Sequence, residues 1–129
     1  FTTIHNYIDI EQMILRKGAV SAKEGERLLI PMNMRDGSFI CTGRGNSDWN
    51  CSAPHGAGRR LSRKETMNNY TLHDFKESMK GIYTSSVSKN TIDECPMAYK
   101  PMDEILENVR DTVRIDQVIK PVYNFKASD

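Results

Sequence analysis

The apolar residues follow one pattern in the first 61 residues and another in the rest of the chain. In the first part they form short runs beside turn residues, at positions 28–30 before Pro31 and at positions 38–42 before Gly43. Short apolar runs bounded by glycine or proline are typical of buried strands. The sequence therefore predicts strands at 28–30 and at 38–42.

From residue 62 onwards, apolar residues recur at helical spacing. Leu72, Phe75 and Met79 lie three and four positions apart, and Gly81 follows them as a stop signal. Pro101 is typical of the first turn of a second helix. The apolar face of that helix consists of Met102, Ile105, Leu106 and Val109. Both segments are predicted to be helices.

Two capping boxes and two more strands complete the predicted fold. Ser62 with Glu65, and Thr71 with Asp74, carry side chains that can bond the free backbone amides at a helix start. Residues 112–120 partly alternate between apolar and polar positions, and residues 122–125 follow Pro121 as a last short strand. The mixture predicts an α+β fold with long functional loops between its elements.

The composition excludes two broad classes of protein. No stretch of the 129 residues approaches the roughly 20 apolar residues that a membrane-spanning helix needs. Apolar residues occur along the whole chain, which argues against intrinsic disorder. The formal net charge is only +1, from 18 Lys+Arg and 17 Asp+Glu, so nucleic acid could be attracted only by a local patch.

The cysteines and the first residues of the chain indicate in which cellular compartment the protein is expected. Cys41, Cys51 and Cys95 are odd in number and form no C-x-x-C pair, so we expect free thiols in a reducing cytoplasm. The chain begins with Phe1 in an apolar, strand-like segment without Met or a signal peptide. We therefore expect a piece of a longer cytoplasmic protein.

The segment richest in residues that could bind a ligand or carry out catalysis follows Pro54. His55 precedes Gly-Ala-Gly, whose amides can approach a ligand closely, and residues 59–64 contain four cations and no acid. Exposed amides that lead into a helix start form an anion site. The imidazole could then bind phosphate, act as a general acid or base, or attack phosphorus. By spacing alone, an ordinary turn with a structural histidine and a solvated basic helix start remains an equal alternative.

The string H-G-A-G-R-x-x-S-R at 55–63 resembles the signature of the RtcB family of GTP-dependent RNA ligases. Other segments resemble the family in the same order: residues 5–7, 16–19, 30–38, 98–101 and 121–127. The resemblance covers nearly all of residues 1–129 but corresponds only to the C-terminal third of a family member. It implies the C-terminal part of an RtcB-type mixed α/β fold, incomplete as a stand-alone domain and lacking the N-terminal portion.

The resemblance implies an activity and its cofactors. Family members use GTP and Mn²⁺ to join RNA 3′-phosphate or 2′,3′-cyclic phosphate ends to 5′-hydroxyl ends, as in tRNA splicing, and an archease-type activator assists some of them. The catalytic residue is a histidine that carries GMP covalently, which corresponds to His55. Because the other metal ligands would lie in the missing portion, we expect the 129 residues alone to be inactive.

The resemblance also assigns site residues. His5 would bind manganese, Tyr99 would stack on guanine, and Lys126 would contact the edge of the guanine. The alternatives without a ligand are a buried or capping histidine, a tyrosine packed in the core and a lysine exposed to solvent. The other implied nucleotide contacts are Asn6, Pro31, Met32, Asn33, Met34, Ser38, Gly56, Ala57 and Gly58. Arg59 and Arg63 would contact phosphate or RNA. Residues 32–36 depart from the Gly-Ser-Met-Gly type of loop of many members, which weakens the assignment of individual roles there.

Two rival functions fit the same residues. A homologue could bind nucleotide or RNA without covalent chemistry, or it could cap and repair nucleic-acid 3′-phosphate ends without joining them. Neither composition nor motif spacing separates these functions from ligation.

Overall fold

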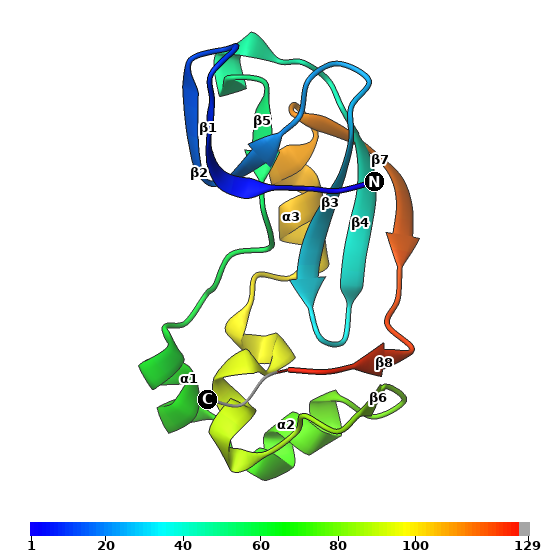
Figure 1. Cartoon of the computed structure of the whole chain (residues 1–129). Coiled ribbons are helices and arrows are strands. Elements are labelled where there is room, and N and C mark those ends of the chain that lie inside the picture. The colour runs from blue at the N-terminus through cyan, green and yellow to red at the C-terminus, as the bar shows by residue number, and fades with distance from the viewer. Residues whose placement is uncertain (127–129) are drawn as a thin grey trace.

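Two three-stranded antiparallel sheets form one half of the molecule (Figure 1), in a computed structural model that describes residues 1–126. The first sheet has the order β1-β2-β5, with strands His5–Asp9, Ile14–Ser21 and Ser52–Pro54. The second has the order β3-β4-β7, with strands Arg27–Asn33, Gly37–Gly43 and Val113–Ile119. The predicted strands at 28–30 and 38–42 are the central parts of β3 and β4.

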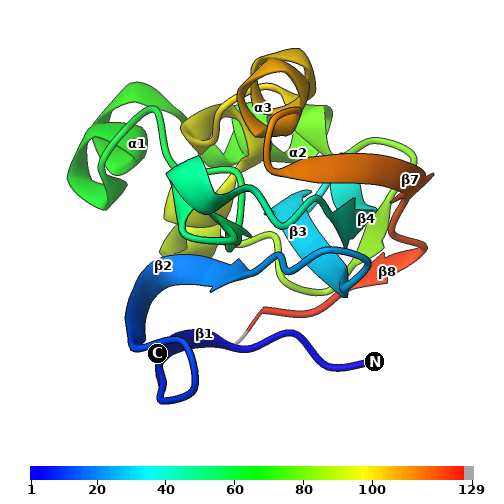
Figure 2. The same ribbon diagram turned by 90° about the horizontal axis from the view of Figure 1, so that it is seen from above.

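Short helices form the other half, together with a small parallel pair of strands (Figure 1). The α-helices are α1 (Arg63–Asn69), α2 (Leu72–Ser78) and α3 (Met102–Val109); the 3₁₀ helices are η1 (Ser47–Trp49), η2 (Lys89–Glu94) and η3 (Pro96–Ala98). β6 (Tyr83–Thr84) pairs with β8 (Tyr123–Asn124). Seen from above, α3 lies beside the β-sheet half, on the side away from β1 and β2, and α1 lies at the edge of the molecule (Figure 2). The α+β prediction is confirmed.

The helix starts follow the predicted capping chemistry. Ser62 caps α1 and Thr71 caps α2, each in a reciprocal capping box, with Glu65 and with Asp74. α2 ends one residue before Met79, which is its C-cap but is still buried. Pro101 is the N-cap of α3 and not its first helical residue, so the prediction was one position early.

Two apolar clusters make up the core. Phe39 and its neighbours on β3 and β4 pack against Ile105 and Val109 of α3. The second cluster surrounds Phe75 of α2. Tyr99 packs against both clusters, so this residue lies where the two halves of the molecule meet.

No helix among the described residues is long and apolar enough to cross a bilayer. Cys41 and Cys95 are buried and Cys51 is half-buried, and all three are free thiols, as predicted. Burial raises the pKa of Cys41 to about 11, which keeps this thiol protonated and unreactive.

A buried arginine joins the three strands of the first sheet. Only 1% of the Arg16 side chain is exposed, and its guanidinium binds Asp9 at 3.0 Å. It also donates to the Tyr7 hydroxyl at 3.0 Å and to the Ser52 hydroxyl at 2.9 Å, at the start of β5. Because a buried charge needs its partners, these bonds fix β5 against β1 and β2.

The Arg16–Asp9 pair predicts a pH dependence of stability. The hydrogen bond from Arg16, followed by that from the Gln12 backbone, lowers the pKa of Asp9 from 3.8 to about 2. The unfolded chain therefore binds more protons between these values, and stability falls as the pH drops from about 4 to about 2. In urea unfolding at several pH values, we expect Asp9→Asn to reduce this fall. Asp103→Asn, at the exposed start of α3, is the control, and an unchanged fall in the Asp9 variant would contradict the prediction.

Candidate active site

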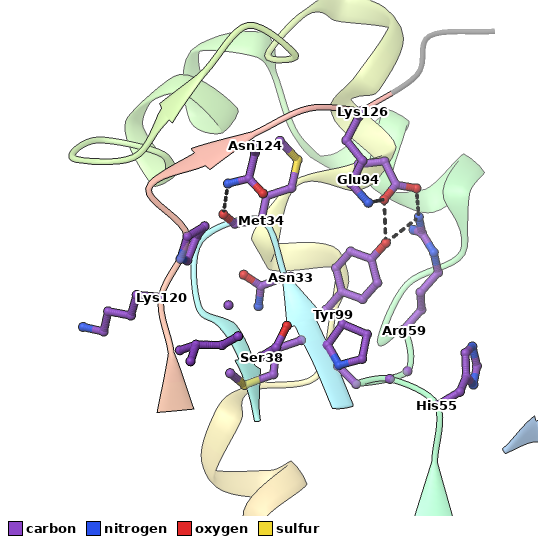
Figure 3. Close-up of a pocket in the computed structure, with 18 residues that line it drawn as sticks. Asn33, Met34, Ser38, His55, Arg59, Glu94, Tyr99, Lys120, Asn124 and Lys126 are labelled. Carbon is purple, nitrogen blue, oxygen red and sulfur yellow. Dashed lines mark hydrogen bonds and ion pairs between the residues drawn. The ribbon is translucent and has the colours of Figure 1, made fainter. Parts of the chain in front are cut away.

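A cavity of about 830 Å³ lies between the loops of the β-sheet half and the helical half (Figure 3). Among the residues that the sequence assigned to the nucleotide, all but Asn6 line it. The lining consists of Pro31, Met32, Asn33, Met34, Gly37, Ser38, His55, Gly56, Ala57, Gly58, Arg59, Glu94, Tyr99, Ile119, Lys120, Pro121, Asn124 and Lys126. Segments far apart in the sequence therefore meet at one cavity.

His55 lies directly after β5, which pairs with β2. Its exposed ring is oriented by one contact, from Nδ1 to the backbone oxygen of Gly18 at 2.7 Å. A carbonyl oxygen can only accept a hydrogen bond, so we assign the ring proton to Nδ1. The lone pair of the neutral imidazole is then on Nε2, which is free to bind a metal or attack an electrophile.

Asn6 binds the other backbone group of the same residue, the N–H of Gly18. Its side-chain oxygen accepts from the Gly18 N–H at 2.6 Å, and Asn6 itself has a left-handed backbone with φ of 61°. The residue sits in the irregularity between His5 and Tyr7 where β1 shifts register against β2. Asn6 thus holds Gly18, the residue of β2 whose backbone oxygen orients His55. It does not line the cavity, contrary to its assignment as a nucleotide contact.

His5 lies next to His55. The two ring centroids are 4.8 Å apart with an interplanar angle of 30°, and both side chains are exposed. Within residues 1–126, no group of three His, Cys, Asp or Glu side chains comes close enough to hold a metal ion. The described residues therefore do not gather a complete metal site, and the role of His5 as a ligand stays a prediction.

The Gly-Ala-Gly loop is fixed on both sides. The Ala57 N–H donates to the Pro31 oxygen at 3.0 Å, and the Gly58 oxygen accepts from the Lys100 N–H at 3.1 Å. The sequence predicts a row of exposed amides that runs into a helix start. That expectation is corrected in one respect, because the Ala57 amide is already paired. The helix start itself lies where the capping box predicts it, with α1 beginning at Arg63 after Ser62.

The loop between β3 and β4 supplies the opposite part of the wall. Met32 and Met34 are buried and give the cavity an apolar lining. The Asn33 side-chain oxygen accepts from the N–H groups of Arg35 and Asp36 at 3.0 and 2.9 Å. Asn33 therefore stabilises its own turn, which leaves less of its side chain for a ligand than the assignment as a nucleotide contact implied.

Tyr99 lies in the middle of the wall (Figure 3). Its hydroxyl donates to Glu94 at 2.8 Å, and the Arg59 guanidinium lies 4.9 Å from its ring centroid. Burial, followed by the hydrogen bond to Glu94, raises the pKa of Tyr99 to about 12. The phenol is therefore neutral, and its ring is fixed by contacts on two sides.

Two arginines of the basic cluster around residue 60 pair with acids that are distant in sequence. Arg59 pairs with Glu94 at 3.1 Å, and Arg63 pairs with both Asp93 and Glu94. Arg63 does not line the cavity, whereas Arg59 does. Two of the four cations of this segment, Arg59 and Arg63, are thus paired with acids in space, and a phosphate at these two guanidinium groups would share them with the two carboxylates.

Several cavity residues were not predicted from the sequence. Glu94, Lys120 and Asn124 line the wall, and Asn124 donates to the Met34 oxygen at 2.5 Å, which ties β8 to the β3–β4 loop. Glu94 lies four residues before the recognised segment 98–101, and this proximity was the one signal that could have identified it.

Comparison with known proteins agrees with the resemblance of the sequence segments. The family model described as "tRNA-splicing ligase RtcB" matches residues 1–127. The chain is 36% identical to the RNA-splicing ligase RtcB of Escherichia coli strain K12 over 124 residues, 92% of this chain. It is 38% identical over 88 residues to the tRNA-splicing ligase RtcB of Aeropyrum pernix, 64% of this chain and 18% of that protein.

The match covers only part of these relatives. The chain spans 30% of the length of the Escherichia coli protein. Ala127, the last residue of the terminal segment that carries the resemblance, lies outside the described residues. The extent of the family match leaves the assignment clear: the chain belongs to the RtcB family.

Proposed function

We propose that residues 1–129 are the nucleotide-binding and guanylylation part of a GTP- and Mn²⁺-dependent RNA ligase, in the C-terminal portion of a longer chain. The ligase joins 3′-phosphate or 2′,3′-cyclic phosphate ends to 5′-hydroxyl ends. Membership of a family described as tRNA-splicing ligases supports RNA as the substrate. A cytoplasmic location and an archease-type activator belong to the same proposal.

The orientation of His55 is the observation that carries the proposal. Because the N–H at Nδ1 donates to the Gly18 oxygen, the lone pair is on Nε2, and it can attack the α-phosphorus of GTP. A nitrogen–phosphorus bond forms, the bond to the β-phosphate oxygen breaks, and pyrophosphate leaves with the electron pair. The Gly18 oxygen stabilises the positive charge that the ring gains in this step.

The covalent His55–GMP is then consumed by RNA. An oxygen of an RNA 3′-phosphate attacks the phosphorus, the bond to Nε2 breaks, and the RNA end is linked to GMP. The 5′-hydroxyl of the second RNA end displaces GMP and forms the new phosphodiester. His55 returns to its starting state with the lone pair on Nε2.

The far end of the cavity suits the base of the nucleotide. Tyr99 offers an aromatic face fixed by Arg59 and Glu94, and Lys126 lies nearby on the same wall. A purine stacks well on such a ring. The apolar side chains of Met32 and Met34 complete the wall around it.

We propose His5 as one ligand of Mn²⁺, because an imidazole suits this metal and the ring lies against His55. The described residues do not gather three such ligands, so the others are proposed to come from outside this chain. Manganese bound there would neutralise charge on the reacting phosphates. This chain by itself is therefore expected not to take up GMP.

Product analysis distinguishes ligation from its two rivals. We expect a full-length ligase that carries this sequence, given GTP and Mn²⁺, to join a 3′-phosphate RNA to a 5′-hydroxyl RNA, with no joined product when the hydroxyl strand is omitted. An end-capping enzyme would instead accumulate the RNA–GMP end with and without the second strand. A protein that only binds nucleotide would transfer no GMP at all. Either of these results would contradict ligation.

A further inference from the structure

Four donors meet at Glu94, the last residue of η2, and Figure 3 shows three of them on the cavity wall, Arg59, Tyr99 and Lys126. One carboxylate oxygen, Oε1, accepts from Arg59 and from Arg63, each at 3.1 Å. The other, Oε2, accepts from the Tyr99 hydroxyl at 2.8 Å and from the Lys126 ammonium at 3.2 Å. The side chain is only 15% exposed. Glu94 is therefore the junction of the cations and the aromatic ring on this wall.

The four contacts leave Glu94 ionised but without a free acceptor. Burial raises its pKa, but the hydrogen bond from Tyr99 and the charges of Lys126 and Arg59 outweigh burial and lower the pKa below its ordinary value. An ionised carboxylate has about four lone-pair sites, and the four donors occupy them. Glu94 therefore acts on a ligand through the residues that it holds.

Lys126 is fixed at both ends. Its backbone N–H donates to the Ser86 hydroxyl at 2.7 Å, and its ammonium binds the same Glu94 oxygen that accepts from Tyr99. An unrestrained lysine side chain loses much rotamer freedom when it binds a ligand. Here the ammonium is held beside the Tyr99 ring in advance, with two of its three donors free for a ligand.

We propose that Glu94 is a positioning residue that sets the base specificity of the cavity by holding the Lys126 ammonium beside the Tyr99 ring. The proposal rests on the proposed function, in which a guanine nucleotide occupies the cavity. Guanine presents the acceptor O6 where adenine presents an amino donor. A fixed ammonium has only donors, so it favours guanine and opposes adenine, whereas a freely rotating one discriminates poorly.

The test is equilibrium binding of radiolabelled GTP and ATP to a full-length ligase that carries this sequence. Glu94→Gln keeps the size of the side chain and an oxygen for Tyr99, but it removes the charge that holds Lys126. We expect the preference for GTP over ATP to fall about tenfold, equally in Lys126→Met, with no further fall in the double variant. Glu104→Gln, which removes the exposed partner of Lys100, is the control and keeps the preference.

The outcomes separate this role from the proposed function. A wild-type preference in Glu94→Gln, or losses that add in the double variant, overturns the role of Glu94 alone. If circular dichroism shows that Glu94→Gln does not fold, Lys126→Met decides, because an unchanged preference in that variant overturns the proposal. A wild-type protein that binds both nucleotides equally, or neither, overturns the proposed function and this inference together.

Discussion

Substitution of His55 by alanine is expected to abolish the labelling of a full-length ligase by GTP. The contact of Nδ1 with Gly18 leaves the lone pair of Nε2 available for attack, and His55 lines the cavity. Loss of a covalent nucleophile removes the first step outright, so labelling should fall at least about 1,000-fold. The measurement is transfer of the α-phosphate of radiolabelled GTP to protein.

His73→Ala is the matched control for this experiment. His73 is an exposed residue of α2 that does not line the cavity, and its loss should leave labelling unchanged. His55 is also exposed, so its replacement should not unfold the protein, and circular dichroism of both variants should match the wild type. Labelling of the His55 variant at the wild-type rate would mean that another residue is the nucleophile.

Gly37→Ala is expected to cause a large loss of stability. Gly37 has φ of +86°, and a Cβ there would lie 2.0 Å from the backbone oxygen of Ile119 on β7. Neither strand can yield without breaking the β4–β7 pairing, in which Ser38 faces Ile119. The strained backbone and the clash together should lower the free energy of unfolding by about 3 kcal/mol.

Gly25→Ala measures the free-energy cost of a left-handed backbone in the absence of a steric clash. Gly25 has a similar φ of +77°, but a Cβ there would meet no atom within 4 Å. This variant should lose only about 1 kcal/mol, the cost of the left-handed backbone. Urea unfolding of the two variants measures both values, and equal losses would show that the contact with Ile119 is not the cause.

The predicted elements were those whose apolar residues face the core. Phe75 of α2, Ile105 of α3 and Phe39 of β4 are buried, and their spacing matches the period of their element. The first sheet was not predicted because β2 reverses the usual pattern: the Leu15 side chain is 72% exposed, whereas Arg16 is 1% exposed. Binary patterning fails where a buried ion pair replaces an apolar residue.

The residues of the candidate site were predicted partly from their chemistry and partly from the family resemblance. The residues alone identified only the segment around His55, whereas the family resemblance identified positions such as Pro31, Tyr99 and Lys126, which line one cavity. Neither identified Glu94, because its role depends on contacts with residues far away in the sequence. Such contacts leave no local pattern, so only the folded structure reveals them.

The most direct test of the central claim is to locate the GMP on the protein. A full-length ligase that carries this sequence is incubated with Mn²⁺ and GTP labelled at the α-phosphate, and the labelled peptide is then isolated. The account predicts one labelled peptide that contains His55, with a bond that is labile in acid and stable in alkali, as expected for a histidine phosphoramidate. Label on a different residue, or no covalent label at all, would contradict it.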